Sequence, residues 1–93
     1  MIKPVRIGDS FSGGSVDRVI NIHWGAHRVS HTFDCIEYEC LFRLNDGSWY
    51  MSEQCDGPNG GEMTTRLSAV DNSTVEAYAD ERKKVWQKRR GSP

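Results

Sequence analysis

The segment of residues 32–44 constrains the fold of this 93-residue chain most strongly, because its apolar residues recur at every second position. A strand points alternate side chains to opposite faces of a sheet, so this period of two predicts a strand with one buried face. The face expected in the core carries Ile36, Tyr38, Cys40, Phe42 and Leu44. The opposite face, expected to lie mostly in water, carries Cys35, Glu37, Glu39, Leu41 and Arg43.

A hairpin is predicted directly after this strand. Asn45, Asp46 and Gly47 tolerate the positive φ that a tight turn requires, and residues 49–52 form the returning strand. Residues 15–22 predict an earlier strand with an imperfect alternation, and residues 63–67 predict a short closing strand. Glycine, proline, asparagine and aspartate in residues 54–62 predict a loop between the last two strands.

A helix is predicted over residues 74–90, which contain neither glycine nor proline. Ser73 and Glu76 have the spacing of a capping box, in which each side chain bonds the other residue's backbone amide. One face of this helix carries mostly apolar residues at helical spacing: Val75, Tyr78, Ala79, Arg82, Val85 and Trp86.

These elements predict one domain over residues 1–93, with a β-rich body at about 4–67 and the C-terminal helix at about 74–90. The fold class is α+β, mainly β: a small strongly bent antiparallel sheet, or an SH3-like barrel, of four to five strands with one C-terminal helix. A chain of this length leaves little volume for a large substrate pocket.

The cysteines and the hydropathy predict a cytoplasmic protein with no membrane partner. Three cysteines are too many by one for a closed disulfide framework. Cys35 and Cys40 are five residues apart in one predicted strand, about 16 Å, which is too far for a bridge. No apolar run approaches the roughly 18 residues of a membrane-spanning helix.

The formal net charge of −1 conceals an uneven distribution. Residues 1–80 hold six basic and twelve acidic residues, a net of −6, whereas residues 81–93 hold six basic residues and one acidic residue, a net of +5. An acidic body with a basic end indicates two surfaces with different partners.

The acidic body supplies the first candidate surface. Carboxylates on the outward strand face and at the two ends of the hairpin, beside exposed aromatic rings, are suited to a basic groove on a partner protein. The predicted partner-binding residues are Trp24, Glu37, Glu39, Asp46, Trp49, Tyr50 and Glu53. The alternative interpretation of the carboxylates is ordinary solubilising charge.

The basic helix end supplies the second candidate surface, which is suited to nucleic-acid phosphates. Its residues are Arg82, Lys83, Lys84, Lys88, Arg89 and Arg90. These charges surround the helix without forming one stripe, and the alternative is a solvated helix end that is partly paired with the acidic body, which is the usual role of such a run.

A third hypothesis is a zinc-stabilised domain or a small Cys/His enzyme. His23, His27, His31 and Cys35 are each four residues apart, a spacing that suits zinc ligands on a helix but not on a strand. Gly25, Val29 and Thr32 make this segment a poor helix, so solvated histidines are the alternative. Cys55 in its loop is the candidate nucleophile.

Residues 13–54 (GGSVDRVINIHWGAHRVSHTFDCIEYECLFRLNDGSWYMSEQ) resemble small bacterial SH3-like β-barrel modules of unknown function. The shared features are a glycine turn, a strand ending near a histidine, a long strand and a strand with a tryptophan. In size, single-domain form and acidic body, the chain also resembles phage-encoded inhibitor proteins, including anti-CRISPR proteins.

The sequence therefore predicts a non-enzymatic small binding protein that docks on a larger protein or nucleoprotein assembly, in the manner of a phage or mobile-element inhibitor. A nucleic-acid-binding accessory protein is the alternative. No catalytic residue and no cofactor is expected, with zinc as the exception under the third hypothesis. The sequence does not indicate an oligomeric state.

Overall fold

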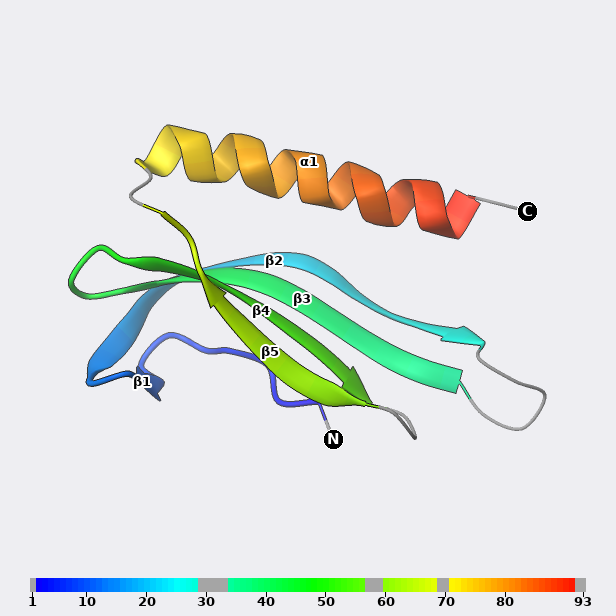
Figure 1. The fold of residues 1–93 in the computed structure, drawn as a ribbon, viewed down its shortest axis with the longest axis horizontal. Helices are drawn as coiled ribbons and strands as arrows, with labels where there is room; N and C mark the ends of the chain where they lie inside the picture. The colour runs from blue at the N-terminus through cyan, green and yellow to red at the C-terminus, as the bar shows by residue number, and fades with distance from the viewer. Residues whose placement is uncertain (1, 29–33, 57–59, 69–70, 92–93) are drawn as a thin grey trace.

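The structure, a computed structural model, describes residues 2–28, 34–56, 60–68 and 71–91, without the side chains of 26–28, 34–36 and 89–91. Its elements are β1 (Ser10–Phe11), β2 (Gly14–Arg28), β3 (Asp34–Leu44), β4 (Trp49–Asp56), β5 (Gly61–Arg66) and α1 (Asn72–Gly91). The strands form one antiparallel sheet in the order β1-β2-β3-β4-β5. The sheet is strongly curled, a half-barrel, and α1 lies along one face (Figure 1). The predicted mainly β fold with a C-terminal helix is confirmed.

Both faces of β3 are covered, which corrects the prediction that one face lies mostly in water. Tyr38 and Phe42 pack with the N-terminal segment on the first face, where Ile2, Val5 and Phe11 complete a core. On the second face, Leu41 packs beneath Val75 and Ala79 of α1. Leu41 and Glu39 are both 0% exposed. The apolar side of α1 has to be buried, and this sheet face is where it packs.

Two irregularities in β2 explain its imperfect alternation. The strand extends well beyond the predicted residues 15–22, and its register with β3 shifts at Asp17 and again at Ile22. A bulge adds one unpaired residue and changes which face the following side chains occupy. Val16 and Val19 therefore share the core beneath the N-terminal segment, whereas Ile20 and Ile22 pack towards α1.

The β3–β4 hairpin forms as predicted. Gly47 has a φ of 91° and donates its amide hydrogen to the Leu44 carbonyl oxygen, and the Leu44 amide bonds Ser48 across the turn. The Asp46 carboxylate accepts hydrogen bonds from the hydroxyl and the amide of Ser48. These hydrogen bonds lower the pKa of Asp46.

The start of α1 differs from the predicted capping box. Asp71, not Ser73, accepts the hydrogen bond from the Thr74 amide, at 2.8 Å. The Ser73 hydroxyl donates to the same carboxylate, and Glu76 is paired with Arg18 of β2 at 2.8 Å. Aspartate is as good an N-cap as serine, and the helix consequently begins at Asn72, slightly before the predicted position.

Candidate functional site

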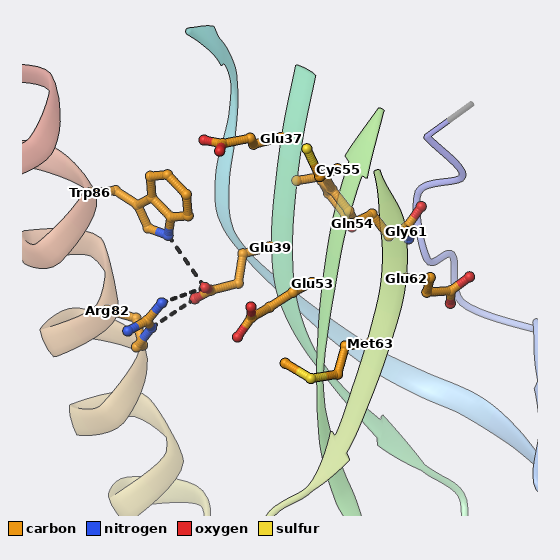
Figure 2. Close-up of a pocket in the computed structure, with 11 residues that line it drawn as sticks. Glu37, Glu39, Glu53, Gln54, Cys55, Gly61, Glu62, Met63, Arg82 and Trp86 are labelled. Carbon is orange, nitrogen blue, oxygen red and sulfur yellow. Dashed lines mark hydrogen bonds and ion pairs between the residues drawn. The ribbon is translucent and has the colours of Figure 1, made fainter. Parts of the chain in front are cut away.

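A buried ion pair joins the middle of β3 to α1. Glu39 is 0% exposed, and both of its carboxylate oxygens accept hydrogen bonds from Arg82. Nε donates to Oε2 at 2.9 Å and Nη2 donates to Oε1 at 2.6 Å, which is the two-point geometry of the strongest arginine–carboxylate pairs (Figure 2). The bonds to Glu39 raise the pKa of Arg82 above its usual value.

Two aromatic rings, Trp86 of α1 and His23 of β2, pack next to this ion pair. The Trp86 indole Nε1 donates to Glu39 Oε1 at 3.3 Å. The His23 ring from β2 stacks on Trp86 with ring centroids 3.9 Å apart, and His23 Nε2 lies 4.0 Å from a Glu37 carboxylate oxygen. A Cβ at Gly25 would lie 3.0 Å from His23 Cε1, so glycine at this position leaves room for the stacked ring.

An acidic pocket of about 560 Å³ lies beside this pair, between α1 and strands β3, β4 and β5. Its lining residues are Glu37, Tyr38, Glu39, Glu53, Gln54, Cys55, Gly61, Glu62, Met63, Arg82 and Trp86. Glu53 points into the same space as the buried pair, whereas Glu62 turns away from Arg82 on the far side of β5 (Figure 2). Among the described residues of this lining there is one cation, Arg82, and there are four glutamates, so carboxylates outnumber cations in the described part of the pocket.

The environment of Glu53 differs from that of Glu39. In the described part of the chain, Glu53 makes no hydrogen bond or ion pair, and it acts on Arg82 through space. Glu53 is half-buried on β4, directly opposite Glu39 of β3 and Met63 of β5. It is therefore a carboxylate that an incoming cation can reach.

The predicted acidic surface is only partly assembled. Glu37, Glu39 and Glu53 share the pocket, but the prediction that Glu39 lies on an outward face is wrong, because α1 covers it. Asp46 lies in the exposed β3–β4 turn, away from the pocket lining. The carboxylates at the two hairpin ends therefore do not form one cluster.

The three predicted aromatic contacts lie in different environments. Trp49 is 2% exposed, and the guanidinium groups of Arg18 and Arg43 lie over its ring at 5.7 and 5.8 Å, so the prediction that it is a surface residue is wrong. Tyr50 is half-buried on the opposite face and stacks with Phe42. Trp24 is 55% exposed, although it lies on β2 and not in a loop. Its role in partner binding stays a prediction.

The basic residues at the end of α1 lie in different environments, which the sequence did not distinguish. Arg82 belongs to the buried pair, in which Glu39 holds and neutralises its guanidinium, so its predicted contact with phosphate stays a prediction. Lys83 is half-buried, Lys84 and Lys88 are exposed, and the side chains of Arg89 and Arg90 lie outside the described part.

Within the described residues, no metal site and no Cys/His catalytic site is assembled. His23 lies on a strand, where residues four apart are too distant to share an ion. His31 and the side chains of His27 and Cys35 are outside the described residues, within which no group of metal ligands is found. Cys55 is disulfide-bonded, so it is not the free thiol that a nucleophile requires.

The other cysteine with a described side chain, Cys40, is buried and therefore unreactive in the folded protein. Cys40 is a free and fully buried thiol, and burial raises its pKa. The disulfide at Cys55 also weakens the argument from cysteine count for a reducing compartment. Within the described residues, no helix has the length and apolar character needed to cross a membrane.

Sequence reasoning missed that Arg82 and Trp86 bind Glu39. A signal was present, because Arg82 lies among the apolar residues of the helix face and a cation there requires a buried counter-charge.

Comparisons with protein-family models, with curated proteins and with solved structures found no match. The function is therefore inferred from the geometry of the site.

Proposed function

We propose that this chain is a non-enzymatic binding protein that docks on a larger protein or nucleoprotein assembly, and that its acidic pocket receives a basic side chain of the partner. The observation that supports this proposal is the excess of carboxylates over cations among the described residues that line the pocket between α1 and β3–β5. Complementary charge directs association and selects partners.

The pocket has an internal division of charge that favours this role. Arg82 uses two donors on Glu39 and so neutralises the buried carboxylate. Glu53 is half-buried in the lining and has no hydrogen-bond partner in the described part of the chain. Its attraction for a cation is stronger in this half-buried site than in open water, because the local dielectric constant is lower.

The walls of the pocket suit a lysine or arginine side chain. Met63 and Trp86 line it together with the glutamates. Long basic side chains pack their methylene groups along apolar surface while the charged end reaches a carboxylate. A basic side chain of a partner would thus place its stem against Met63 or Trp86 and its charge beside Glu53.

An inhibitor of phage or mobile-element type, similar to anti-CRISPR proteins, is the more specific form of this proposal. Its support is the net charge of −6 over residues 1–80. A cytoplasmic location belongs to the same proposal, and the disulfide at Cys55 weighs against it.

Binding of a fluorescein-labelled oligoarginine peptide, followed by fluorescence anisotropy, tests the pocket. We expect Glu53→Gln to weaken binding about fivefold or more, since it removes the reachable charge of a half-buried site. Asp80→Asn is the matched control, because it removes one exposed carboxylate of α1 outside the pocket. Equal affinity for the two variants would contradict the proposal.

The exposed lysines of α1 support a second candidate function, nucleic-acid binding. Lys84 and Lys88 are one helical turn apart and both exposed. Phosphate contacts make affinity fall steeply with salt, so binding of a labelled DNA duplex should be salt-dependent and weaker for the doubly substituted Lys84→Glu, Lys88→Glu protein. Binding that is unchanged by salt and by these substitutions would exclude this candidate.

A further inference from the structure

The strand β5 is a free edge of the sheet. In the described part of the chain it pairs with β4 alone and ends the strand order, and Figure 1 shows it at the border of the sheet. Five of its six residues are exposed. It contains no proline and no lysine, which are common devices that keep edge strands from pairing with other chains. As far as the described residues extend, this edge is therefore open to a further strand.

The hydrogen-bond pattern shows which backbone groups of β5 point outward. The Leu67 amide donates to the Trp49 carbonyl oxygen at 2.9 Å. In an antiparallel pair, hydrogen-bonded and non-hydrogen-bonded residue pairs alternate along the strands. Counted back from Leu67, the residues whose backbone groups bond β4 are therefore Thr65, Met63 and Gly61. The amide and carbonyl groups of the residues between them point to the free edge: Glu62, Thr64 and Arg66.

The three outward residues are self-complementary, and we propose that β5 pairs antiparallel with β5 of a second copy of this chain. A register centred on Thr64 places Glu62 of one copy directly opposite Arg66 of the other, twice in the pair. Neither Glu62 nor Arg66 makes an ion pair within the described residues, and both are exposed. Opposite charges directly across strands stabilise a pair, and a two-fold axis uses each contact twice.

The other face of β5 supports the same register. Met63 is 56% exposed, and in this pairing it lies opposite Thr65 of the second copy and diagonal to the second Met63. The two sheets then form one continuous ten-stranded sheet across the axis. Since Gly61 and Met63 also line the acidic pocket, the dimer places two such pockets beside one shared strand pair. This inference goes beyond the proposed function and stands without it.

Sedimentation velocity over a concentration series tests the pairing. The protein is expected to shift from monomer to dimer as concentration rises. Thr64→Pro removes only an amide that points to the free edge, a position where a sheet tolerates proline, so it is expected to abolish the dimer. Thr64→Ala keeps that amide and is expected to retain it. Circular dichroism checks that both variants are folded.

A charge exchange tests the register. Glu62→Arg and Arg66→Glu each create two like-charge contacts, and each is expected to weaken dimerisation about tenfold or more. The doubly exchanged protein recreates both opposite-charge contacts and is expected to recover the dimer. A protein that stays monomeric, a dimer that survives Thr64→Pro, or a double variant that fails to recover would each overturn the proposal. A foreign strand that binds β5 of a monomeric chain would also overturn it.

Discussion

Replacing Arg82 by methionine tests the buried ion pair that joins α1 to the sheet. The substitution keeps most of the side-chain volume and leaves the Glu39 carboxylate, 0% exposed, with the Trp86 indole as its remaining hydrogen-bond partner among the described residues. Removing one partner of a buried pair costs about 3–5 kcal/mol, because a buried charge is then left uncompensated. A small domain has about 5–15 kcal/mol of unfolding free energy, so this loss is a large part of the total.

The matched control is the second arginine–glutamate pair that connects the sheet to α1. Arg18 and Glu76 also approach to 2.8 Å, but their side chains are 35% and 59% exposed. A solvent-exposed pair contributes at most about 1 kcal/mol, so Arg18→Met is expected to cost far less than Arg82→Met. The two variants thus compare one interaction in two environments.

Urea unfolding followed by circular dichroism measures both free energies, and a double variant separates charge from packing. Glu39→Leu together with Arg82→Met removes both charges, and buried pairs replaced by apolar residues are often neutral or stabilising. We expect the double variant to be more stable than Arg82→Met alone. Equal costs for Arg82→Met and Arg18→Met would refute the reasoning that Glu39 is buried and dependent on Arg82.

Two further predictions concern the helix cap and the buried thiol. Asp71→Ala should lower the melting temperature by a few degrees and Ser73→Ala should lower it less, as measured by thermal circular dichroism. Hydrogen bonds lower the pKa of Asp71, so its stabilising effect is present above the usual aspartate pKa and disappears as the pH falls through the lowered value. The melting temperatures of the wild type and Asp71→Ala should therefore become equal in acid. Cys40 should resist a thiol reagent in the folded protein and react on unfolding, because burial raises its pKa and blocks access; rapid labelling of the native protein at Cys40 would contradict this placement.

The local elements could be predicted from the sequence because their signals are local. The alternation in residues 32–44 and the Asn45-Asp46-Gly47 turn predicted a hairpin that the structure contains. The helix was predicted to within a few residues of its observed bounds. The predicted N-cap residue of this helix was wrong, because Asp71 and Ser73 are both good N-caps and the sequence spacing alone did not decide between them.

The candidate site was predicted only in part, because its central contact is distant in sequence. Glu37, Glu39 and Glu53 were chosen for their charge, and they do share one pocket. The partner of Glu39 is 43 residues away on α1, and no local pattern connects the two positions. Arg82 was consequently assigned to a phosphate-binding surface, although it stabilises a buried carboxylate.

The strands, the turn and the helix follow from local patterns in the sequence, and so do the mainly β fold and the uneven distribution of charge. Which strand faces are covered depends on the packing of distant segments. Periodicity of two distinguishes the two faces of β3 but does not state whether one or both are buried, because that depends on what packs against the sheet. Here the N-terminal segment and α1 cover opposite faces. Because of that packing, Glu39 is half of a buried pair and not the expected surface charge, and Glu53 is a half-buried residue of the pocket lining.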